Sequence, residues 1–504
     1  MRGPADMMNR KNALLILAFS LLMPALLQAA PSPETELLYQ QHCASCHGQD
    51  RLGGMGPALL PDNLSRLKKP QAEDAIRNGR PATQMPAFAD VLAGESITAL
   101  ADFIYRPPAR PPIWGRSEIV GSHLLPHPQG TLPDEPAYQA DMMNLFLVVE
   151  IGDHHVTLLD GDRMEPIHRF PSRYALHGGP KYSPDGRYVY FGSRDGWITK
   201  YDLFNLKVVA EVRAGINMRN IAISADGDYV MAANYLPHTL VLFDAGNLEL
   251  MDIIPVENSA GESSRVSAVY AAPPRNSFIA ALKDIPEAWE ISVQDGNANV
   301  RRMQTDTWLD DFFFDPGYDH LIGAARDGKH GVVINLDTGK TVADLPLPGM
   351  PHLGSGITWE YQGTRVMATP HFRTGAVSII DMDNWQVIKT LETEGPGFFM
   401  RSHVNSRYAW VDVFFGPNKD KVHIIDKQTL EIVKTLQPEP GKVAAHVEFD
   451  RYGEKLLLSI WDKEGAVVVY DADTLEEEKR IPMNKPSGKY NVWNKINYEE
   501  GTSH

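Results

Sequence analysis

Ser183-Pro184-Asp185-Gly186-Arg187-Tyr188-Val189-Tyr190 leads to a closing Lys200-Tyr201-Asp202, and this pattern returns further along the chain. The second copy, Ser224-Ala225-Asp226-Gly227-Asp228-Tyr229-Val230-Met231, closes with Leu242-Phe243-Asp244. Each copy is an Asp/Gly turn followed by strand-forming residues, and no helical period lasts beyond Asn144. The repeat therefore predicts a fold built from several similar β units.

Weaker copies extend this repeat over the rest of the chain. They run over 315–335, 361–381, 405–426 and 451–471, with a degenerate copy near 272–292 and an outer half over 145–160. The spacing between closing residues is the length of one four-stranded propeller blade. We therefore predict an all-β eight-bladed β-propeller over residues 145–504, with the leftover 489–497 closing the ring against the first blade.

Cys43-Ala44-Ser45-Cys46-His47 is a different kind of signal, because Cys-x-x-Cys-His is the covalent attachment motif of a c-type haem. Cys43 and Cys46 would form thioether bonds to the haem, and His47 would be an axial iron ligand. A disulfide or half of a zinc site is the alternative, but the chain has only 2 Cys and no second pair. The motif predicts one covalent haem c.

Residues 31–105 around this motif are predicted to form a small all-α class I cytochrome c domain, with helices over 34–42 and 94–104. The sixth iron ligand must come from a loop. Met85, in Gln84-Met85-Pro86, is the best candidate, because a methionine before proline can present its sulfur to the iron. Met55 is the second candidate. The third possibility is that Met85 only packs against its neighbours and binds no iron.

Residues 1–30 carry Arg10 and Lys11 and then the apolar run 13–27. This run is too short for a membrane span and is typical of a secretory signal peptide, with an uncleaved anchor as the alternative. Because c-type haem is attached outside the bacterial cytoplasm, we expect a periplasmic protein without stable membrane insertion.

Residues 106–144 are predicted to link the two domains. Arg106-Pro107-Pro108-Ala109-Arg110-Pro111-Pro112 cannot be helical and is a semi-rigid spacer. The following 113–144 are expected to be irregular and to wrap across the propeller.

Composition agrees with this multidomain organisation. Of 504 residues, 43% are hydrophobic and 22% charged, and 40 Gly with 37 Pro suit a turn-rich β protein. The formal net charge is −16 and no Lys/Arg cluster is interleaved with aromatic residues. Nucleic acid is therefore not an expected partner.

In a propeller, the residue that precedes each innermost strand is expected at the mouth of the central channel. Here these positions are rich in His and Arg, namely His177, Arg219, Asp310 with Asp311, His352, Arg401 with His403, and His446. One such histidine is often a structural residue bonded into a turn. A ring of them from different blades suits a flat polyanion, with histidine binding a metal and arginine pairing with carboxylates.

With its export signal, haem c motif and Pro-rich link, the chain resembles the cytochrome cd1 nitrite reductase superfamily over nearly its whole length. The matching motifs are Tyr174-Ala175-Leu176-His177, Arg194-Asp195-Gly196-Trp197-Ile198 and Gly488-Lys489-Tyr490-Asn491-Val492. The resemblance implies that haem d1, a macrocycle with carboxylate side chains and one acrylate, binds in the propeller. His177 matches the proximal iron ligand. Candidates to hold the carboxylates are Arg194, Arg219, Arg373 and Lys489, with surface ion pairs as the alternative for the arginines.

Departures from the family pattern bear on the reaction. Asp310 and Asp311 stand where a nitrite reductase has its first distal histidine, His352 matches the second, and Ser355 replaces a basic residue. A nitrite site that lacks a proton donor would be a poor catalyst. The pattern resembles instead the branch that oxidises dihydro-haem d1 in the last step of haem d1 biosynthesis, which implies that His352 binds iron and that His446, with Tyr490, acts on the substrate.

That reaction converts a propionate into an acrylate and removes two electrons and two protons. Haem c can take one electron and the macrocycle's ferric iron the other, and the chain has no dinucleotide-binding fingerprint. His446 would be the general base. A cytochrome cd1 nitrite reductase and a non-enzymatic haem d1 carrier are the alternatives. Expected partners are dihydro-haem d1, a periplasmic electron acceptor and, transiently, apo-nitrite reductase.

Overall fold

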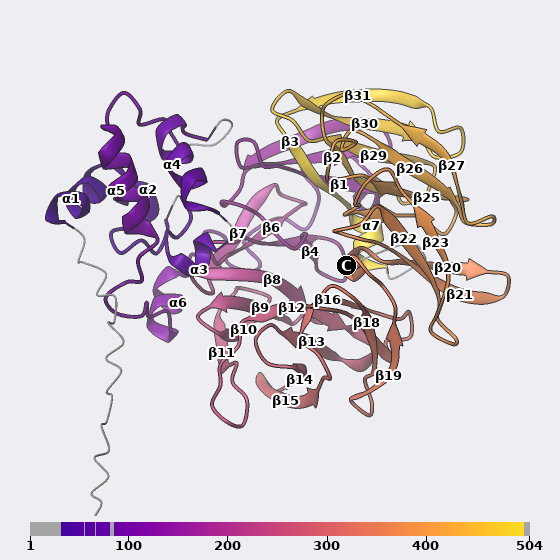
Figure 1. Ribbon diagram of the computed structural model, residues 1–504, viewed down its shortest axis with the longest axis horizontal. Helices are drawn as coiled ribbons and strands as arrows, with labels where there is room; N and C mark the ends of the chain where they lie inside the picture. The colour runs from indigo at the N-terminus through magenta and orange to yellow at the C-terminus, as the bar shows by residue number, and fades with distance from the viewer. Residues whose placement is uncertain (1–31, 55, 66, 81–84, 498–504) are drawn as a thin grey trace, which may run out of the picture.

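The computed structural model describes residues 32–54, 56–65, 67–80 and 85–497, so the signal peptide predicted over 1–30 and the candidate ligand Met55 lie outside the described residues. A small helical domain stands beside a ring of β-sheets (Figure 1). In the described ranges no helix has the length and apolar character that crossing a bilayer requires.

The helical domain contains α1 (Pro33–His42), α2 (Ala44–His47), α3 (Pro61–Leu64), α4 (Lys69–Asn78) and α5 (Gly94–Ile104). The helices predicted over 34–42 and 94–104 are confirmed as α1 and α5. Tyr39 of α1 and Ile97 and Leu100 of α5 are buried at the centre of this domain. The sequence analysis missed α4, whose buried face consists of Ala72, Ala75 and Ile76 and gives a weak apolar signal.

Within the described residues, the propeller strands form eight four-stranded sheets, which we number as blades 1 to 8 in chain order. Blade 1 contains β32 (Pro486–Asn491), β1 (Leu145–Glu150), β2 (His155–Asp160) and β3 (Glu165–Pro171), and blade 2 contains β4 (Lys181–Tyr182), β5 (Tyr188–Gly192), β6 (Trp197–Asp202) and β7 (Lys207–Arg213). Blade 3 contains β8 (Asn217–Ile223), β9 (Tyr229–Leu236), β10 (Thr239–Asp244) and β11 (Leu250–Pro255), and blade 4 contains β12 (Val266–Ala272), β13 (Ser277–Leu282), β14 (Glu287–Gln294) and β15 (Asn297–Gln304).

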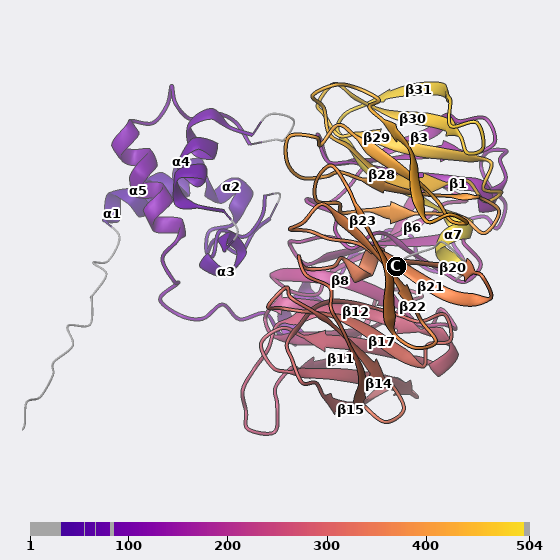
Figure 2. The same cartoon turned by 45° about the vertical axis from the view of Figure 1, so that its right-hand side comes forward.

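Blades 5 to 8 follow the same plan around the ring (Figure 2). Blade 5 contains β16 (Leu309–Phe314), β17 (His320–Ala325), β18 (Gly331–Asn335) and β19 (Lys340–Leu345), and blade 6 contains β20 (Ile357–Tyr361), β21 (Thr364–Pro370), β22 (Ala376–Asp381) and β23 (Gln386–Glu392). Blade 7 contains β24 (Met400–Arg401), β25 (Tyr408–Asp412), β26 (Val422–Asp426) and β27 (Glu431–Leu436), and blade 8 contains β28 (Ala444–Phe449), β29 (Lys455–Ile460), β30 (Gly465–Asp471) and β31 (Glu477–Met483).

The eight-bladed propeller predicted from the repeat is confirmed, and so is its closure. Strand β32 pairs with β1 from Phe146↔Asn491 to Glu150↔Pro486, so the last strand completes the first blade. The helix α7 (Val492–Ile496) follows β32 at once. The propeller therefore closes its ring by hydrogen bonds between its first and last strands.

Burial decreases from the middle of each blade outward. Strands such as β13, β28 and β30 are almost entirely buried, whereas the outermost strands β19, β23 and β27 alternate between exposed and partly buried residues. Each fully buried Val, Leu or Ile contributes about 1.5–3 kcal/mol relative to exposure. The charged side chains on the outer edges discourage pairing with other chains.

The linker contains a helix, α6 (Arg116–Ser122), so the prediction that 113–144 is irregular is wrong there. The helix begins where the Glu118 carboxylate accepts the Gly115 N–H at 2.8 Å, and it buries Ile119 against the propeller. A seven-residue helix with one buried apolar residue leaves little periodic signal. The rest of the segment wraps across the propeller as expected, for example through His127, whose Nδ1 lies 2.8 Å from the Val208 carbonyl oxygen.

Candidate functional site

The haem c motif is folded for metal binding. Nδ1 of His47 lies 2.8 Å from the carbonyl oxygen of Pro57, so Nδ1–H donates there and the Nε2 lone pair stays available for iron. Burial lowers the pKa of His47, which favours the neutral ligand form. Gly56 packs against the ring, since a Cβ there would lie 2.8 Å from the His47 Cε1. The motif residues thus fit a haem c held by His47, with Cys43 and Cys46 at the start and in the body of α2.

Met85 packs against the same apolar cluster as Cys43 and Phe88. The described part of the 79–88 loop therefore lies at the core that holds the haem motif. This supports Met85 as sixth ligand, which remains a prediction.

Met85→Ala is expected to change the absorption spectrum of haem c and to lower its reduction potential, because a methionine ligand raises the potential of a His-ligated haem. Redox titration of the purified holoprotein measures this. Met142→Ala in the linker is the control and should change neither quantity. An unchanged spectrum and potential in Met85→Ala would point to another ligand, with Met55 next.

Bulges in the inner strands carry several site residues. In β8, β16 and β28 the pairing with the neighbouring strand skips one residue, and the skipped residues are Arg219, Asp310 and His446. A bulge turns its side chain out of the regular alternation. These side chains were expected just before the inner strands and in fact lie within them.

His177 lies between two of the predicted arginines. Its Nδ1 is 2.7 Å from the Arg219 carbonyl oxygen, and its Nε2 is 3.1 Å from Nη2 of Arg194 and 3.0 Å from Nη1 of Arg219. Nδ1–H donates to the carbonyl, so Nε2 is the acceptor and the candidate metal ligand. The site therefore brings together a ligand nitrogen and two cations suited to a carboxylated macrocycle.

His352 is buried on the other side of the channel. Its Nδ1–H donates to the carbonyl oxygen of Phe398, and the rings of Phe372 and Phe398 lie 4.5 Å from its own, centroid to centroid. Burial lowers the pKa of His352, although the Asp311 carboxylate 3.8 Å from Nε2 opposes this. With its proton on Nδ1, a neutral imidazole keeps the lone pair of Nε2, so His352 is again a candidate metal ligand.

Blade positions fix the directions from which these histidines approach. His177 precedes the inner strand of blade 2 and His352 that of blade 6, four blades away in a ring of eight. The two histidines therefore face each other across the axis. His446, in blade 8, lies two blades from each and so approaches at about a right angle to the line that joins them.

Asp310 is held by cations. Its carboxylate lies 2.8 Å from Nζ of Lys283 and 3.1 Å from Nε of Arg326. Burial alone raises the pKa of Asp310, but these hydrogen bonds and charges lower it overall. Asp310 is therefore ionised, and it cannot donate a proton as the first distal histidine of a nitrite reductase does.

His446 occupies an unusual backbone position, with φ of 55° in the left-handed region. Such a conformation costs a non-glycine residue about 1–3 kcal/mol and is concentrated at functional sites. Nδ1 accepts the Lys489 N–H at 3.3 Å, so the neutral ring carries its proton on Nε2. Burial, with the charges of Lys489, Arg401 and Lys495, lowers the pKa of His446 well below its usual value.

Tyr490 connects the His177 and His446 regions. It lines a small cavity together with His177, and its ring lies 5.2 Å from that of His446, edge to face. Gly179, at φ 69°, also lines this cavity, and a Cβ there would lie 3.0 Å from Tyr490 Cε1. Burial raises the pKa of Tyr490, so its phenol stays protonated.

The remaining predicted residues are placed differently. Lys489 is fully buried and its Nζ donates to Ser459 Oγ at 2.7 Å. Arg373 is exposed on the β21–β22 loop, and its guanidinium lies beside Gly328. The expectation that His403 belongs to the channel ring is wrong, because β24 ends at Arg401 and His403 lies in the following turn, where its Nδ1 accepts the Asn405 N–H at 3.1 Å.

Asp412 is a site residue that the sequence analysis missed. Its buried carboxylate accepts the N–H groups of Phe398 at 2.8 Å, Phe399 at 3.0 Å and His446 at 3.2 Å. Burial raises its pKa to about 6. One carboxylate thus ties the loop beside His352 to the bulge of His446. An acid within the otherwise apolar run 409–413 was the available signal, since such acids are rarely buried without partners.

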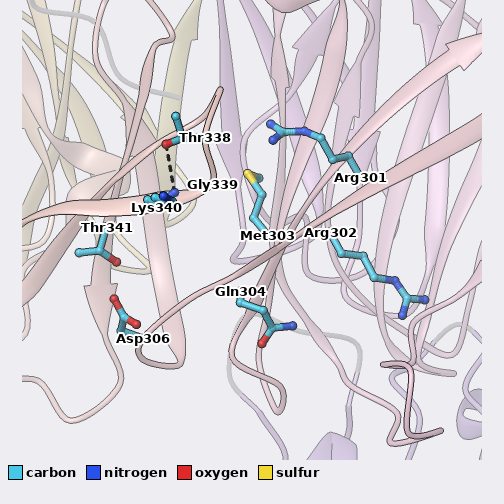
Figure 3. Close-up of a pocket in the computed structure, with 9 residues that line it drawn as sticks. All are labelled: Arg301, Arg302, Met303, Gln304, Asp306, Thr338, Gly339, Lys340 and Thr341. Carbon is cyan, nitrogen blue, oxygen red and sulfur yellow. Dashed lines mark hydrogen bonds between the residues drawn. The ribbon is translucent and has the colours of Figure 1, made fainter.

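A larger hollow lies on the outer strands β15 and β19, lined by Arg301, Arg302, Met303, Asp306 and Lys340 among others (Figure 3). Nη2 of Arg301 pairs with Glu290 at 2.6 Å. Because these are the outermost strands of blades 4 and 5, this hollow does not belong to the histidine site.

Comparisons with known proteins agree with the division of the chain into a helical cytochrome domain and a propeller. Residues 140–495 match the family described as cytochrome D1 heme domain, and residues 32–104 match cytochrome C oxidase, cbb3-type, subunit III. The dihydro-heme d1 dehydrogenase of Pseudomonas aeruginosa is 58% identical over 97% of this chain and 99% of its own length, and the nitrite reductase of Stutzerimonas stutzeri is 26% identical over 96% and 98%. A solved structure of dihydro-heme d1 dehydrogenase NirN in complex with DHE matches with a TM-score of 0.90 and 58% identity, over 93% of this chain and all of that one.

Proposed function

The chain belongs to the cytochrome D1 heme domain family, and we propose that within it this protein is a periplasmic enzyme that oxidises dihydro-haem d1. The reaction converts a propionate side chain into an acrylate, the last step of haem d1 biosynthesis. The observation that carries the proposal is the 58% identity to a dihydro-heme d1 dehydrogenase over 97% of the chain, against 26% identity to a nitrite reductase over 96% of it.

The electron balance needs two acceptors. Forming the acrylate double bond removes two hydrogens from adjacent carbons, that is, two protons and two electrons. Haem c, held by Cys43, Cys46 and His47, supplies a one-electron acceptor. The ferric iron of the substrate takes the second electron. This accounts for a cytochrome domain joined to the propeller.

His177 and His352 would hold the substrate iron from opposite sides, because they face each other across the axis. Held in this way, the macrocycle would have its iron between the two histidines and its edge toward the blades that lie between 2 and 6. His446, at about a right angle to the line that joins the two histidines, meets the edge of the macrocycle, where a propionate is attached.

His446 would take the substrate proton at Nδ1, the unprotonated nitrogen of its neutral ring. Protonation there displaces the long 3.3 Å contact from the Lys489 N–H. Tyr490, whose phenol stays protonated, can donate a hydrogen bond to the carboxylate beside the reacting carbon. Arg194 and Arg219 would pair with carboxylates near His177, and Arg373 and Lys489 are the weaker candidates.

Nitrite should be a poor substrate, because two histidines leave the iron no open position and because Asp310 is ionised between Lys283 and Arg326. Loaded with haem d1, the protein is expected to reduce nitrite at least about 100-fold more slowly than a nitrite reductase, the usual cost of a missing proton donor. Nitrite consumption with a reduced electron donor measures this. Turnover comparable with a true reductase would restore the nitrite reductase hypothesis.

Two partners follow from this chemistry. Haem c must be reoxidised by a periplasmic electron acceptor, and the finished haem d1 must reach apo-nitrite reductase through a transient contact. The excess of negative charge, −16, gives no support to nucleic acid as a partner.

The test is to add dihydro-haem d1 anaerobically to the purified protein and to follow the absorption spectrum and the mass of the macrocycle. Loss of two hydrogens together with reduction of haem c is the expected result. Binding without any change of mass would contradict the enzyme and support a haem d1 carrier.

A further inference from the structure

Arg213 joins the two domains through a single buried side chain. It ends β7 of the propeller, and its Nη2 donates to the carbonyl oxygen of Leu52 in the cytochrome domain. Its Nε donates to the carbonyl oxygen of Asp195 at 2.7 Å. The residue is 5% exposed, and Trp114 lies 4.4 Å from the guanidinium carbon.

On the cytochrome side, Arg213 contacts the loop that positions the haem c ligand. The N–H of Gly53 donates to the His47 carbonyl oxygen at 2.8 Å, and Pro57 of the same loop accepts from the His47 ring. The guanidinium packs closely here, since a Cβ at Gly53 would lie 3.1 Å from Nη2 of Arg213. A displacement of Arg213 therefore acts on the loop that holds His47.

On the propeller side, Arg213 contacts the loop that carries Arg194. Asp195 follows Arg194 directly, and the Arg194 backbone N–H donates to the Ala175 carbonyl oxygen at 3.0 Å. Nη2 of Arg194 lies 3.1 Å from Nε2 of His177. Arg213 thus bonds to Asp195, the neighbour in sequence of Arg194, and the Arg194 guanidinium contacts the candidate iron ligand His177.

A buried apolar contact between the two domains lies beside these hydrogen bonds. Ala58 and Leu60 of the cytochrome domain pack with Ile216 of the propeller, and all three are at most 1% exposed. The Trp114 indole N–H donates to the Arg213 carbonyl oxygen at 3.0 Å. Hydrogen bonds from a charged donor are stronger where water is excluded, and leaving a buried carbonyl without its donor is costly.

We propose that Arg213 is a positioning residue that docks the haem c loop onto blade 2, beside His177, and so sets the rate at which haem c receives its electron. This proposal rests on the proposed function. In the step concerned, the bound substrate gives up one electron and the haem c iron passes from ferric to ferrous.

The experiment compares holoprotein with Arg213→Leu, Arg213→Lys and the control Arg275→Leu, which removes a mostly buried arginine paired with Glu290 in blade 4. The first readout is amide hydrogen exchange of 48–60, which should speed up only in the Arg213 variants. The second is single-turnover reduction of haem c by bound dihydro-haem d1. It should slow by about tenfold or more in Arg213→Leu, since small misplacements of reacting groups have effects of at least this size.

Arg213→Lys keeps the charge and can reach one carbonyl, so it should recover part of the rate. Reduction of haem c by a small external reductant and binding of dihydro-haem d1 should stay unchanged in every variant. Should Arg213→Leu fail to fold, the lysine variant provides the same comparison.

Wild-type exchange and wild-type single-turnover rates in the Arg213 variants would overturn the proposal. Failure of the proposed function has a different signature, because the wild-type protein itself would then leave the mass of dihydro-haem d1 unchanged. The hydrogen-exchange readout would still decide whether Arg213 docks the loop.

Discussion

His446→Ala is expected to bind dihydro-haem d1 with a near-native spectrum and to form the acrylate about 100- to 10,000-fold more slowly, the usual range for loss of a general base. The residue lies on a bulge in blade 8, at about a right angle to the His177–His352 line, and in the proposed binding mode it would reach the edge of the macrocycle but not its iron. The mass of the macrocycle after anaerobic incubation measures the rate.

Two further variants separate catalysis from binding. His177→Ala should change the iron spectrum itself, whereas His403→Ala, in the turn after β24, should change neither spectrum nor rate. Full turnover by His446→Ala would make this histidine a structural residue of the bulge, and the base would have to be another group.

Replacing both Cys43 and Cys46 by serine is expected to abolish covalent haem c and to reduce acrylate formation to the background rate. Binding in the propeller should persist, because both proposed iron ligands, His177 and His352, belong to the propeller, at blades 2 and 6. Denaturing gel staining for haem and the macrocycle mass are the measurements.

The reason for this large effect is that only the ferric iron of the substrate remains as an acceptor once haem c is missing, so one of the two electrons has no acceptor. An added one-electron oxidant such as ferricyanide should therefore restore part of the reaction, and Ser45→Ala, between the two cysteines, is the control. Wild-type turnover without haem c and without added oxidant would show that the cytochrome domain is not the electron acceptor.

The propeller could be predicted because its information is local and repeated. A turn before a strand-forming run recurs in most blades, most clearly as Asp/Gly in blades 2 and 3, and the closing residues mark the blade length. The helices α4 and α6 were not predicted, since each buries a few small or apolar residues against another element and carries little periodicity of its own.

The bulges could not be predicted, because strand register depends on how neighbouring strands pair and a skipped residue leaves no mark in a single sequence. Arg219, Asp310 and His446 were therefore expected at the entry to their inner strands, whereas each is the second or third residue of its strand. His403 was misplaced for a related reason, since its inner strand β24 is only two residues long.

The closing strand β32 makes the first blade and the site depend on the same few residues. It supplies Tyr490 beside His446 and the backbone N–H that meets the His446 ring, and it also seals β1 at the seam of the ring. A chain cut before Pro486 would lose two things together: the strand that pairs with β1, and the contacts of Lys489 and Tyr490 with His446. Closure of the ring and the contacts of His446 are thereby encoded in one segment of six residues, so that neither can be lost without the other.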